Sequence, residues 1–134
     1  MTDAKTDLTK SKKILLVEDD DNLAEVYETR LIAEGFVVKR VADGEQALAS
    51  AKAFHPDLVL LDVMMPKISG FDVLDILRNT PGVGGGKFIM LTARGQEADK
   101  KRAKELGADD YLVKSQVAMS DVIANIKHHL GLTP

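Results

Sequence analysis

Polar residues follow four of the apolar runs in this chain. They are Glu18 and Asp19 after Ile14–Val17, Asp62 after Leu58–Leu61, Thr92 after Phe88–Leu91, and Lys114 after Tyr111–Val113. Three carboxylates, a hydroxyl and an ammonium are too polar to fill a core. Carboxylates brought together repel one another unless a cation neutralises them. Oxygen ligands with no His or Cys nearby favour Mg²⁺, held by one or two carboxylates, water and substrate phosphate.

Asp62 is the candidate nucleophile of this set, because a carboxylate can attack a phosphoryl group and form an acyl phosphate. Lys114 would then serve the phosphoryl group as a point charge, and Thr92 would donate a hydrogen bond to it. Taken alone, Asp62 is equally well a turn-forming aspartate. Thr92 alone is a strand-end hydroxyl and Lys114 alone a solvated charge. Only their joint placement favours phosphoryl chemistry.

The elements that position these residues are five strand–helix units in strict alternation. Strands are predicted over residues 14–17, 36–41, 58–61, 88–91 and 111–113. Helices are predicted over residues 22–34, 45–53 and 96–106, and two further helices begin at about residue 70 and at a cap formed by Ser120. Continuously apolar strands indicate a parallel sheet covered on both faces. The fold class is therefore a doubly wound α/β domain, whose ligands bind at the carboxyl ends of the strands.

Composition limits the function further. The chain has 134 residues, 45% of them hydrophobic and 29% charged, which suits one domain. It has no cysteine, which excludes disulfides and thiolate chemistry. A net charge of −3 gives no electrostatic reason to expect nucleic acid or a membrane as a partner. Residues 1–11 are polar and predict a disordered tail without a secretory signal, and a cytoplasmic location fits.

Two further features suggest a ligand or metal site, but their sequence patterns do not support one. The stretch Gly82–Lys87 resembles a phosphate-binding loop, but Pro81 stands at the first glycine of the Walker pattern and Phe88 replaces its hydroxyl residue. We expect a flexible connection at the opposite edge of the sheet. His55, His128 and His129 show no metal-binding spacing with a carboxylate and are expected at the surface.

The sequence resembles the receiver domains of bacterial two-component response regulators over nearly all of residues 12–130. The resemblance rests on four motifs in order: Leu16-Val17-Glu18-Asp19-Asp20, Leu61-Asp62-Val63-Met64-Met65-Pro66 with Gly70 behind it, Met90-Leu91-Thr92-Ala93, and Tyr111-Leu112-Val113-Lys114. It implies a flavodoxin-like sheet of order 2-1-3-4-5 with five helices, a receiver domain over residues 12–131, and a chemotaxis-type, single-domain regulator.

The resemblance also implies roles for the acidic residues and the lysine. Asp62 matches the phosphoacceptor that attacks phosphohistidine on a partner kinase. Asp19 matches the direct Mg²⁺ ligand and Glu18 reaches the metal through water, with Asp62 and the backbone carbonyl of Met64 completing the protein ligands. Lys114 matches the residue that pairs with the acceptor carboxylate and then with the phosphoryl group.

A second group of residues is implied to report and tune phosphorylation. Thr92 matches the switch hydroxyl, and Tyr111 matches the aromatic that turns inward when Thr92 is drawn to the phosphoryl group. Ala93 is small, as expected where a partner approaches. Met64 and Arg94 should flank the route of attacking water and offer no general base, which predicts slow hydrolysis of the acyl phosphate.

One departure from the family pattern follows Lys114. Proline, often after a cis peptide bond, is usual at the next position, and this chain has Ser115. A cis bond before a residue other than proline costs roughly 2.5–4 kcal/mol. The loop is therefore either trans or strained, which puts the resting position of Lys114 in question.

The expected function is a phosphorylation-dependent signalling switch. The donor would be a sensor histidine kinase or a histidine phosphotransfer protein, and the 96–130 face would control a downstream protein, with no direct nucleic acid or membrane contact. The domain would be no enzyme beyond its own phosphoryl transfer and dephosphorylation, acting either alone or as a piece of a longer protein. The rivals are an aspartyl-phosphate phosphohydrolase, which lacks a second acid where Met64 stands, and a receiver-like fold that is never phosphorylated.

Overall fold

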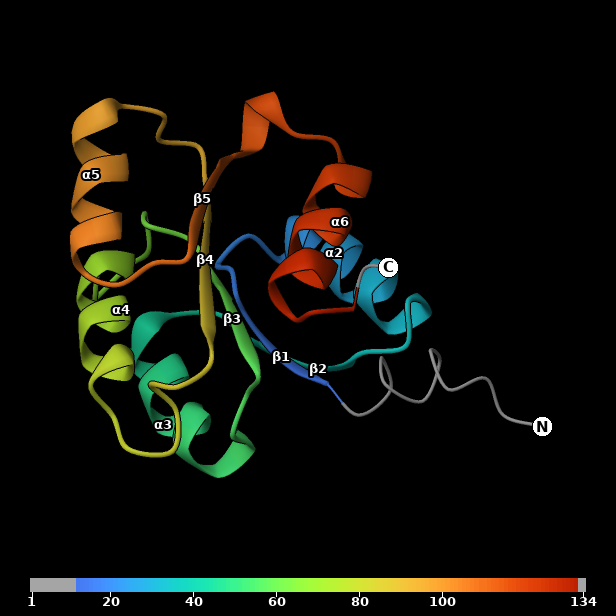
Figure 1. The fold of residues 1–134 in the computed structure, drawn as a ribbon, viewed down its shortest axis with the longest axis horizontal. Coiled ribbons are helices and arrows are strands. Elements are labelled where there is room, and N and C mark those ends of the chain that lie inside the picture. Colours follow the sequence, from blue (N-terminus) through green and yellow to red (C-terminus); the bar gives the residue numbers. More distant parts are fainter. Residues whose placement is uncertain (1–11, 133–134) are drawn as a thin grey trace.

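The computed structural model describes residues 12–132, which form a five-stranded sheet with helices on both faces (Figure 1). The strands are β1 (Lys13–Val17), β2 (Val37–Val41), β3 (Leu58–Leu61), β4 (Lys87–Thr92) and β5 (Asp110–Val113). The helices are α2 (Asp21–Ala33), α3 (Gly44–Phe54), α4 (Gly70–Arg78), α5 (Glu97–Glu105) and α6 (Met119–His129), with a 3-10 turn η1 (Lys114–Gln116). The tail predicted over residues 1–11 lies outside the described residues.

The sheet has the order β2-β1-β3-β4-β5, and every neighbouring pair of strands is parallel. The predicted fold class, strand order and number of helices are confirmed. The carboxyl ends of β1, β3, β4 and β5 therefore lie at one edge of the sheet, which we call the carboxyl edge. The amino ends of the same strands form the opposite amino edge.

The core lies in two layers, one on each face of the sheet. Helices α3, α4 and α5 cover one face, while α2 and α6 cover the other (Figure 1). Along β1, Leu15 and Val17 belong to the first layer, and Ile14 and Leu16 belong to the second. Successive residues of a strand point to opposite faces, so a strand covered on both faces must be apolar throughout.

Helix α6 differs from the prediction at its start and in the exposure of one histidine. It begins at Met119 and Ser120 does not cap it, because the Asp121 carboxylate instead accepts the N–H of Ala118 at 2.8 Å. Near its end, His129 is not a plain surface residue. Its side chain is 18% exposed, and its Nε2 lies 2.9 Å from Asp110 Oδ2.

The contact of His129 joins α6 to β5. Asn125 donates to the same Asp110 oxygen at 2.7 Å. A carboxylate at a neighbouring strand could not be found from helical spacing alone, which explains why the histidine was assigned to the surface. Among residues 12–132, no helix is long and apolar enough to cross a bilayer.

Candidate functional site

Lys114 joins two buried carboxylates at the carboxyl edge. Its Nζ lies 2.7 Å from Glu18 Oε1 and 2.9 Å from Asp62 Oδ2. Glu18 and Asp62 are only 3% and 6% exposed. The three side chains come from the ends of β1, β3 and β5, as the sequence predicted. Hydrogen bonds between ionised partners are short and strong, so this contact fixes the direction of the Asp62 carboxylate.

The loop after β3 holds Asp62 through backbone contacts. The N–H of Met64 donates to Asp62 Oδ1 at 3.1 Å, and the N–H of Gly70 donates to the carbonyl of Val63 at 2.8 Å. A Cβ at position 70 would lie 2.0 Å from the carbonyl oxygen of Asp62 and 2.7 Å from Val63 Cα. Only glycine fits there, because α4 begins directly against the backbone of Asp62.

Glu18 is held by residues that the sequence analysis missed. Arg40 on β2 donates through Nε and Nη2 to the carbonyl oxygen of Glu18, at 3.0 and 2.7 Å. The N–H of Asp20 donates to Glu18 Oε2 at 3.2 Å. Arg40 could have been found from its position near the carboxyl end of β2, which neighbours β1. A long cationic side chain at that position can reach the carboxyl end of β1.

Burial and ion pairing shift the pKa values of Glu18 and Lys114 in opposite directions. Burial raises the pKa of Glu18, and this outweighs the hydrogen bond from Lys114 that lowers it. Burial alone would lower the pKa of Lys114, but its hydrogen bonds to Glu18 and Asp62 prevail and raise it. The ammonium therefore stays charged at neutral pH and compensates part of the buried negative charge.

The site has the donors that a divalent cation requires. Glu18, Asp19 and Asp62 each offer a carboxylate oxygen, and these three atoms lie within 4.8 Å of one another. Lys114 supplies one positive charge against three negative ones. Asp19 is exposed, and no cation pairs with its carboxylate among the described residues. Hard oxygen donors with uncompensated negative charge fit Mg²⁺, as predicted.

Thr92 and Tyr111 lie at opposite ends of a short chain of contacts through Arg94. Thr92 is fully buried, and its Oγ1 accepts the N–H of Arg94 at 3.3 Å. The Tyr111 hydroxyl donates to the Arg94 carbonyl at 2.7 Å. The Arg94 guanidinium donates to both oxygens of Asp99 at 3.1 Å each. Asp99 was missed because a helix rich in charge predicts a solvated face.

The remaining predicted residues lie at the surface of the same edge. Ala93 is exposed beside Thr92, and the Met64 side chain is 55% exposed. The peptide bond between Lys114 and Ser115 is trans, and η1 follows directly. Ser115 therefore does not prevent Lys114 from reaching both carboxylates.

Comparison with known proteins places these features in a family context. The model of the response regulator receiver domain matches residues 14–127. The probable transcriptional regulator ycf27 of Cyanophora paradoxa is 48% identical over 103 residues, which are 77% of this chain and 42% of that protein. The DNA-binding response regulator MtrA of Mycolicibacterium smegmatis is 43% identical over 106 residues, which are 79% of this chain and 45% of MtrA.

A solved structure of similar fold contains the cation that the acidic residues imply. The receiver domain of the sensor histidine kinase PA1611 from Pseudomonas aeruginosa has a TM-score of 0.81 and 30% identity, with coverage of 90% of this chain and 98% of that one. Its structure has a magnesium ion coordinated in the active site cleft. In this chain the carboxylates of Glu18, Asp19 and Asp62 are the hard donors grouped closely enough to hold such an ion.

The exclusion of nucleic acid as a partner is wrong. MtrA is a DNA-binding response regulator and ycf27 a probable transcriptional regulator. The chain spans less than half the length of these relatives, at 45% and 42%. The charge of such a stretch reports only on its own surface, so a net charge of −3 cannot exclude DNA as a partner of proteins of this kind.

Proposed function

Because the chain belongs to the response regulator receiver domain family, we propose that Asp62 is its phosphoacceptor. Receiver domains of this family are phosphorylated on an aspartate with Mg²⁺ and act as signalling switches. The observation that carries the assignment is the contact of Lys114 with Asp62 at 2.9 Å, inside a group of three carboxylates. Asp62 is the member of that group that emerges from the central strand.

In the proposed reaction an oxygen of the Asp62 carboxylate attacks the phosphorus of a phosphohistidine. A new O–P bond forms, the P–N bond breaks, and the imidazole leaves with the electron pair. The Met64 N–H holds Oδ1 and Lys114 holds Oδ2, so the carboxylate is oriented before the donor arrives. Preorganisation of this kind is the main source of catalysis in phosphoryl transfer.

Glu18, Asp19 and Asp62, with the backbone carbonyl of Met64, would hold the Mg²⁺ ion. When bound, the ion neutralises charge on the phosphoryl oxygens and so lowers the repulsion between donor and carboxylate. Lys114 already provides one fixed positive charge at the same place. The ammonium can turn from the carboxylates to a phosphoryl oxygen because its flexible stem carries three donors.

The conformational change would begin at Thr92. A phosphoryl group on Asp62 offers new acceptors to the Thr92 hydroxyl, whose hydrogen can rotate toward them. The Thr92 side chain would then move toward the phosphoryl group, and its Oγ1 would draw with it the Arg94 N–H and, through the Arg94 carbonyl, the Tyr111 hydroxyl. Tyr111 and the 96–130 face would then shift between two arrangements, and Ala93 would leave room for the approaching partner.

The donor is a sensor histidine kinase or a histidine phosphotransfer protein in this proposal, and the site of action is the cytoplasm. A chemotaxis-type, single-domain regulator remains a prediction for the output. The relatives MtrA and ycf27 favour the alternative, control of DNA binding in a longer regulator, and we propose that alternative as the better supported one. The domain itself would catalyse only its own phosphorylation and hydrolysis of its acyl phosphate.

Intact-mass spectrometry tests the assignment. The protein is incubated with acetyl phosphate and Mg²⁺, and a single phosphoryl addition is expected. The addition should disappear in Asp62→Asn and remain in Asp72→Asn, an exposed aspartate on α4. A gain that survives Asp62→Asn would overturn the proposal. Turnover of an added phosphate ester would instead support the phosphohydrolase.

A further inference from the structure

A pocket lies at the amino edge of the sheet, at the opposite end of the strands from Asp62. It has a volume of about 540 Å³, within the usual range for small-molecule sites. Its basic lining residues are Lys12, His55, Lys87 and His129. We propose that this pocket binds a small phosphate-bearing molecule, at a site independent of the phosphoacceptor.

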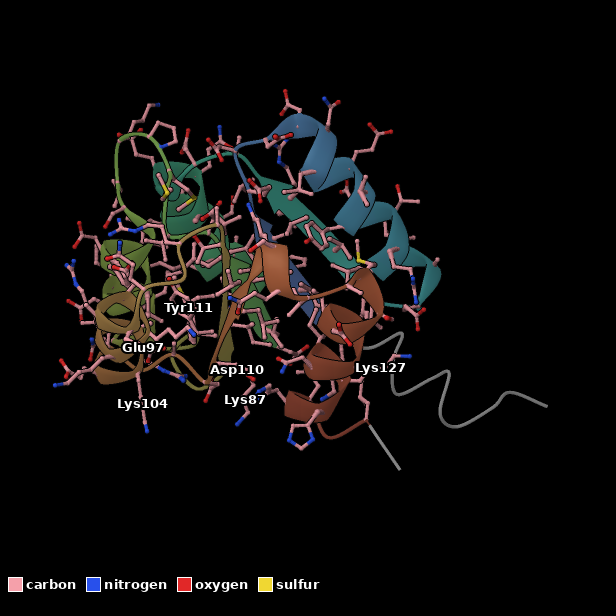
Figure 2. All side chains as sticks on the ribbon, turned by 90° about the horizontal axis from the view of Figure 1, so that it is seen from above. Lys87, Glu97, Lys104, Asp110, Tyr111 and Lys127 are labelled. Atoms are coloured by element: carbon pink, nitrogen blue, oxygen red, sulfur yellow. The ribbon has the colours of Figure 1, made fainter. Side chains whose placement is uncertain are left out.

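Parallel topology explains why the basic residues meet. Lys12 directly precedes β1 and Lys87 begins β4, so both lie at the amino edge. His55 directly follows α3 and His129 is the last residue of α6, and both of these helices finish at the same edge. In Figure 2, Lys87 and Asp110, the partner of His129, lie together at the lower edge of the molecule.

Charge in the pocket favours an anion. Lys12 and Lys87 both line the pocket, and neither forms an ion pair with another residue among 12–132. The one lining carboxylate, Asp57, is engaged because it accepts the N–H of Lys13 at 2.8 Å. Ammonium groups act as point charges that suit phosphate.

The glycine-rich loop forms one wall and is firmly held. Arg78 donates through Nη1 to the carbonyl oxygens of Gly84 and Gly86, at 2.9 and 2.6 Å. The N–H groups of Gly82 and Gly85 donate no hydrogen bond within the described part of the chain. The Gly84 and Gly86 carbonyls already accept hydrogen bonds from Arg78, while the Gly82 and Gly85 N–H groups have no acceptor within the described residues. The loop can therefore donate hydrogen bonds to an anion.

His129 adds a donor or an acceptor at the pocket wall. Its Nε2 is committed to Asp110 at 2.9 Å, so Nδ1 is the ring nitrogen left for a ligand. The pocket is larger than one phosphate group, so the remainder of the volume would take an organic part. Pro56, Val83 and Leu130 supply apolar surface for it.

The test is a backbone-amide NMR titration of the full chain, without Mg²⁺, with AMP, inorganic phosphate or chloride at matched ionic strength. We expect saturable AMP shifts at Gly82, Gly85 and Lys87, with weaker binding of inorganic phosphate. Lys87→Gln and Lys12→Gln should each weaken AMP binding roughly tenfold. Lys101→Gln, an exposed lysine outside the pocket, should not.

Three results would overturn the pocket assignment. One is a response to chloride equal to that to AMP, and another is equal weakening by Lys101→Gln. The third is shifts confined to Asp62, Thr92 and Lys114, which would place the anion at the carboxyl edge. Phosphorylation of Asp62 is measured separately, so failure of this test leaves the assignment of the phosphoacceptor intact.

Discussion

The Lys114 ammonium lies 2.9 Å from the Asp62 carboxylate although the peptide bond after Lys114 is trans. The short turn η1 begins at Lys114 itself and includes Ser115. The contact therefore depends on the end of β5 and on the attraction of two buried carboxylates. A proline at the next position is not needed for this geometry.

Replacing Lys114 should slow phosphorylation. In Lys114→Gln we expect the rate with acetyl phosphate and Mg²⁺ to fall on the order of 100-fold, since a preorganised charge at the transferred group is lost. Intact mass against time measures the rate. Lys101→Gln removes the same charge at an exposed position and should react at the original rate. An unchanged rate in folded Lys114→Gln would exclude a role for the ammonium in the transfer.

Adding a methyl group at position 70 should destabilise the domain. The new Cβ would lie 2.0 Å from the Asp62 carbonyl oxygen, so either α4 or the loop must move. For Gly70→Ala we expect a loss of about 1–3 kcal/mol in the free energy of unfolding, measured by urea denaturation. Gly85→Ala is the matched control, because no atom lies within 4 Å of its Cβ position. Equal stability of the two variants would contradict the close approach.

Tyr111 should resist ionisation in the folded protein. Burial, with the nearby Asp99 charge, raises its pKa to about 12. The chain has two tyrosines, so the Tyr27→Phe variant leaves Tyr111 as the sole source of phenolate absorbance. We expect little phenolate at pH 11 when the protein is folded and a majority of phenolate in urea. Because the folded pKa is raised, the stability from this group is present below pH 10 and lost as the pH rises toward 12. A folded-state midpoint near 10 would be inconsistent with the burial.

Glu34 should make the domain more stable above its unfolded pKa than below it. Hydrogen bonds from Lys127 at 2.6 Å and Arg30 at 3.1 Å lower the pKa of Glu34. A lowered pKa means that the folded state binds the proton less readily than the unfolded chain. The stabilisation is therefore present above about pH 4.5 and lost as the pH falls below it.

The size of the Glu34 effect is limited by exposure, since its side chain is 23% exposed. We expect about 1 kcal/mol or less. Urea unfolding of Glu34→Gln between pH 3 and 7 should show a flatter pH dependence than the parent protein. Glu25→Gln, at an exposed position on α2, should keep the parent slope. Parallel slopes for the parent and Glu34→Gln would rule out the lowered pKa.

Met64 should lengthen the life of the acyl phosphate. Its side chain is 55% exposed beside Asp62 and can neither orient nor deprotonate water. In Met64→Asn we expect roughly tenfold faster loss of the phosphoryl group, less than a positioned general base contributes. The decay is followed by intact mass after the donor is removed. Ile76→Asn also replaces an exposed apolar residue by asparagine, on α4, and should decay like the parent. No acceleration in Met64→Asn would refute the tuning role.

The fold could be predicted from the sequence because its strongest signals are local. Four of the strands are continuous apolar runs, and each is followed by a helical stretch, although the stretch over 96–106 is mostly charged. The placement of the candidate site residues at one edge could also be predicted, because parallel strands bring their carboxyl ends together. That rule alone brings Asp62, Glu18 and Lys114 together.

The contacts that hold the site could not be predicted, because they depend on side-chain direction across elements. Arg40 reaches the carbonyl of Glu18 from β2, and Asp99 pairs with Arg94 from within a charged helix. His129 was assigned to the surface because nothing in its own helix indicates that Asp110 on β5 lies beside it. A long charged side chain has many possible partners, and sequence spacing does not select among them.

The contacts of Arg78 determine where this chain can be cut or extended. Its guanidinium binds the carbonyls of Gly84, Gly86 and Gly107 and the carboxylate of Asp109. An exposed glycine-rich loop is ordinarily a good place for a protease to cut or for a tag to be inserted. Here the Arg78 side chain holds that loop against the turn before β5. A peptide inserted between residues 82 and 86 would therefore separate two parts of the chain that pack against each other.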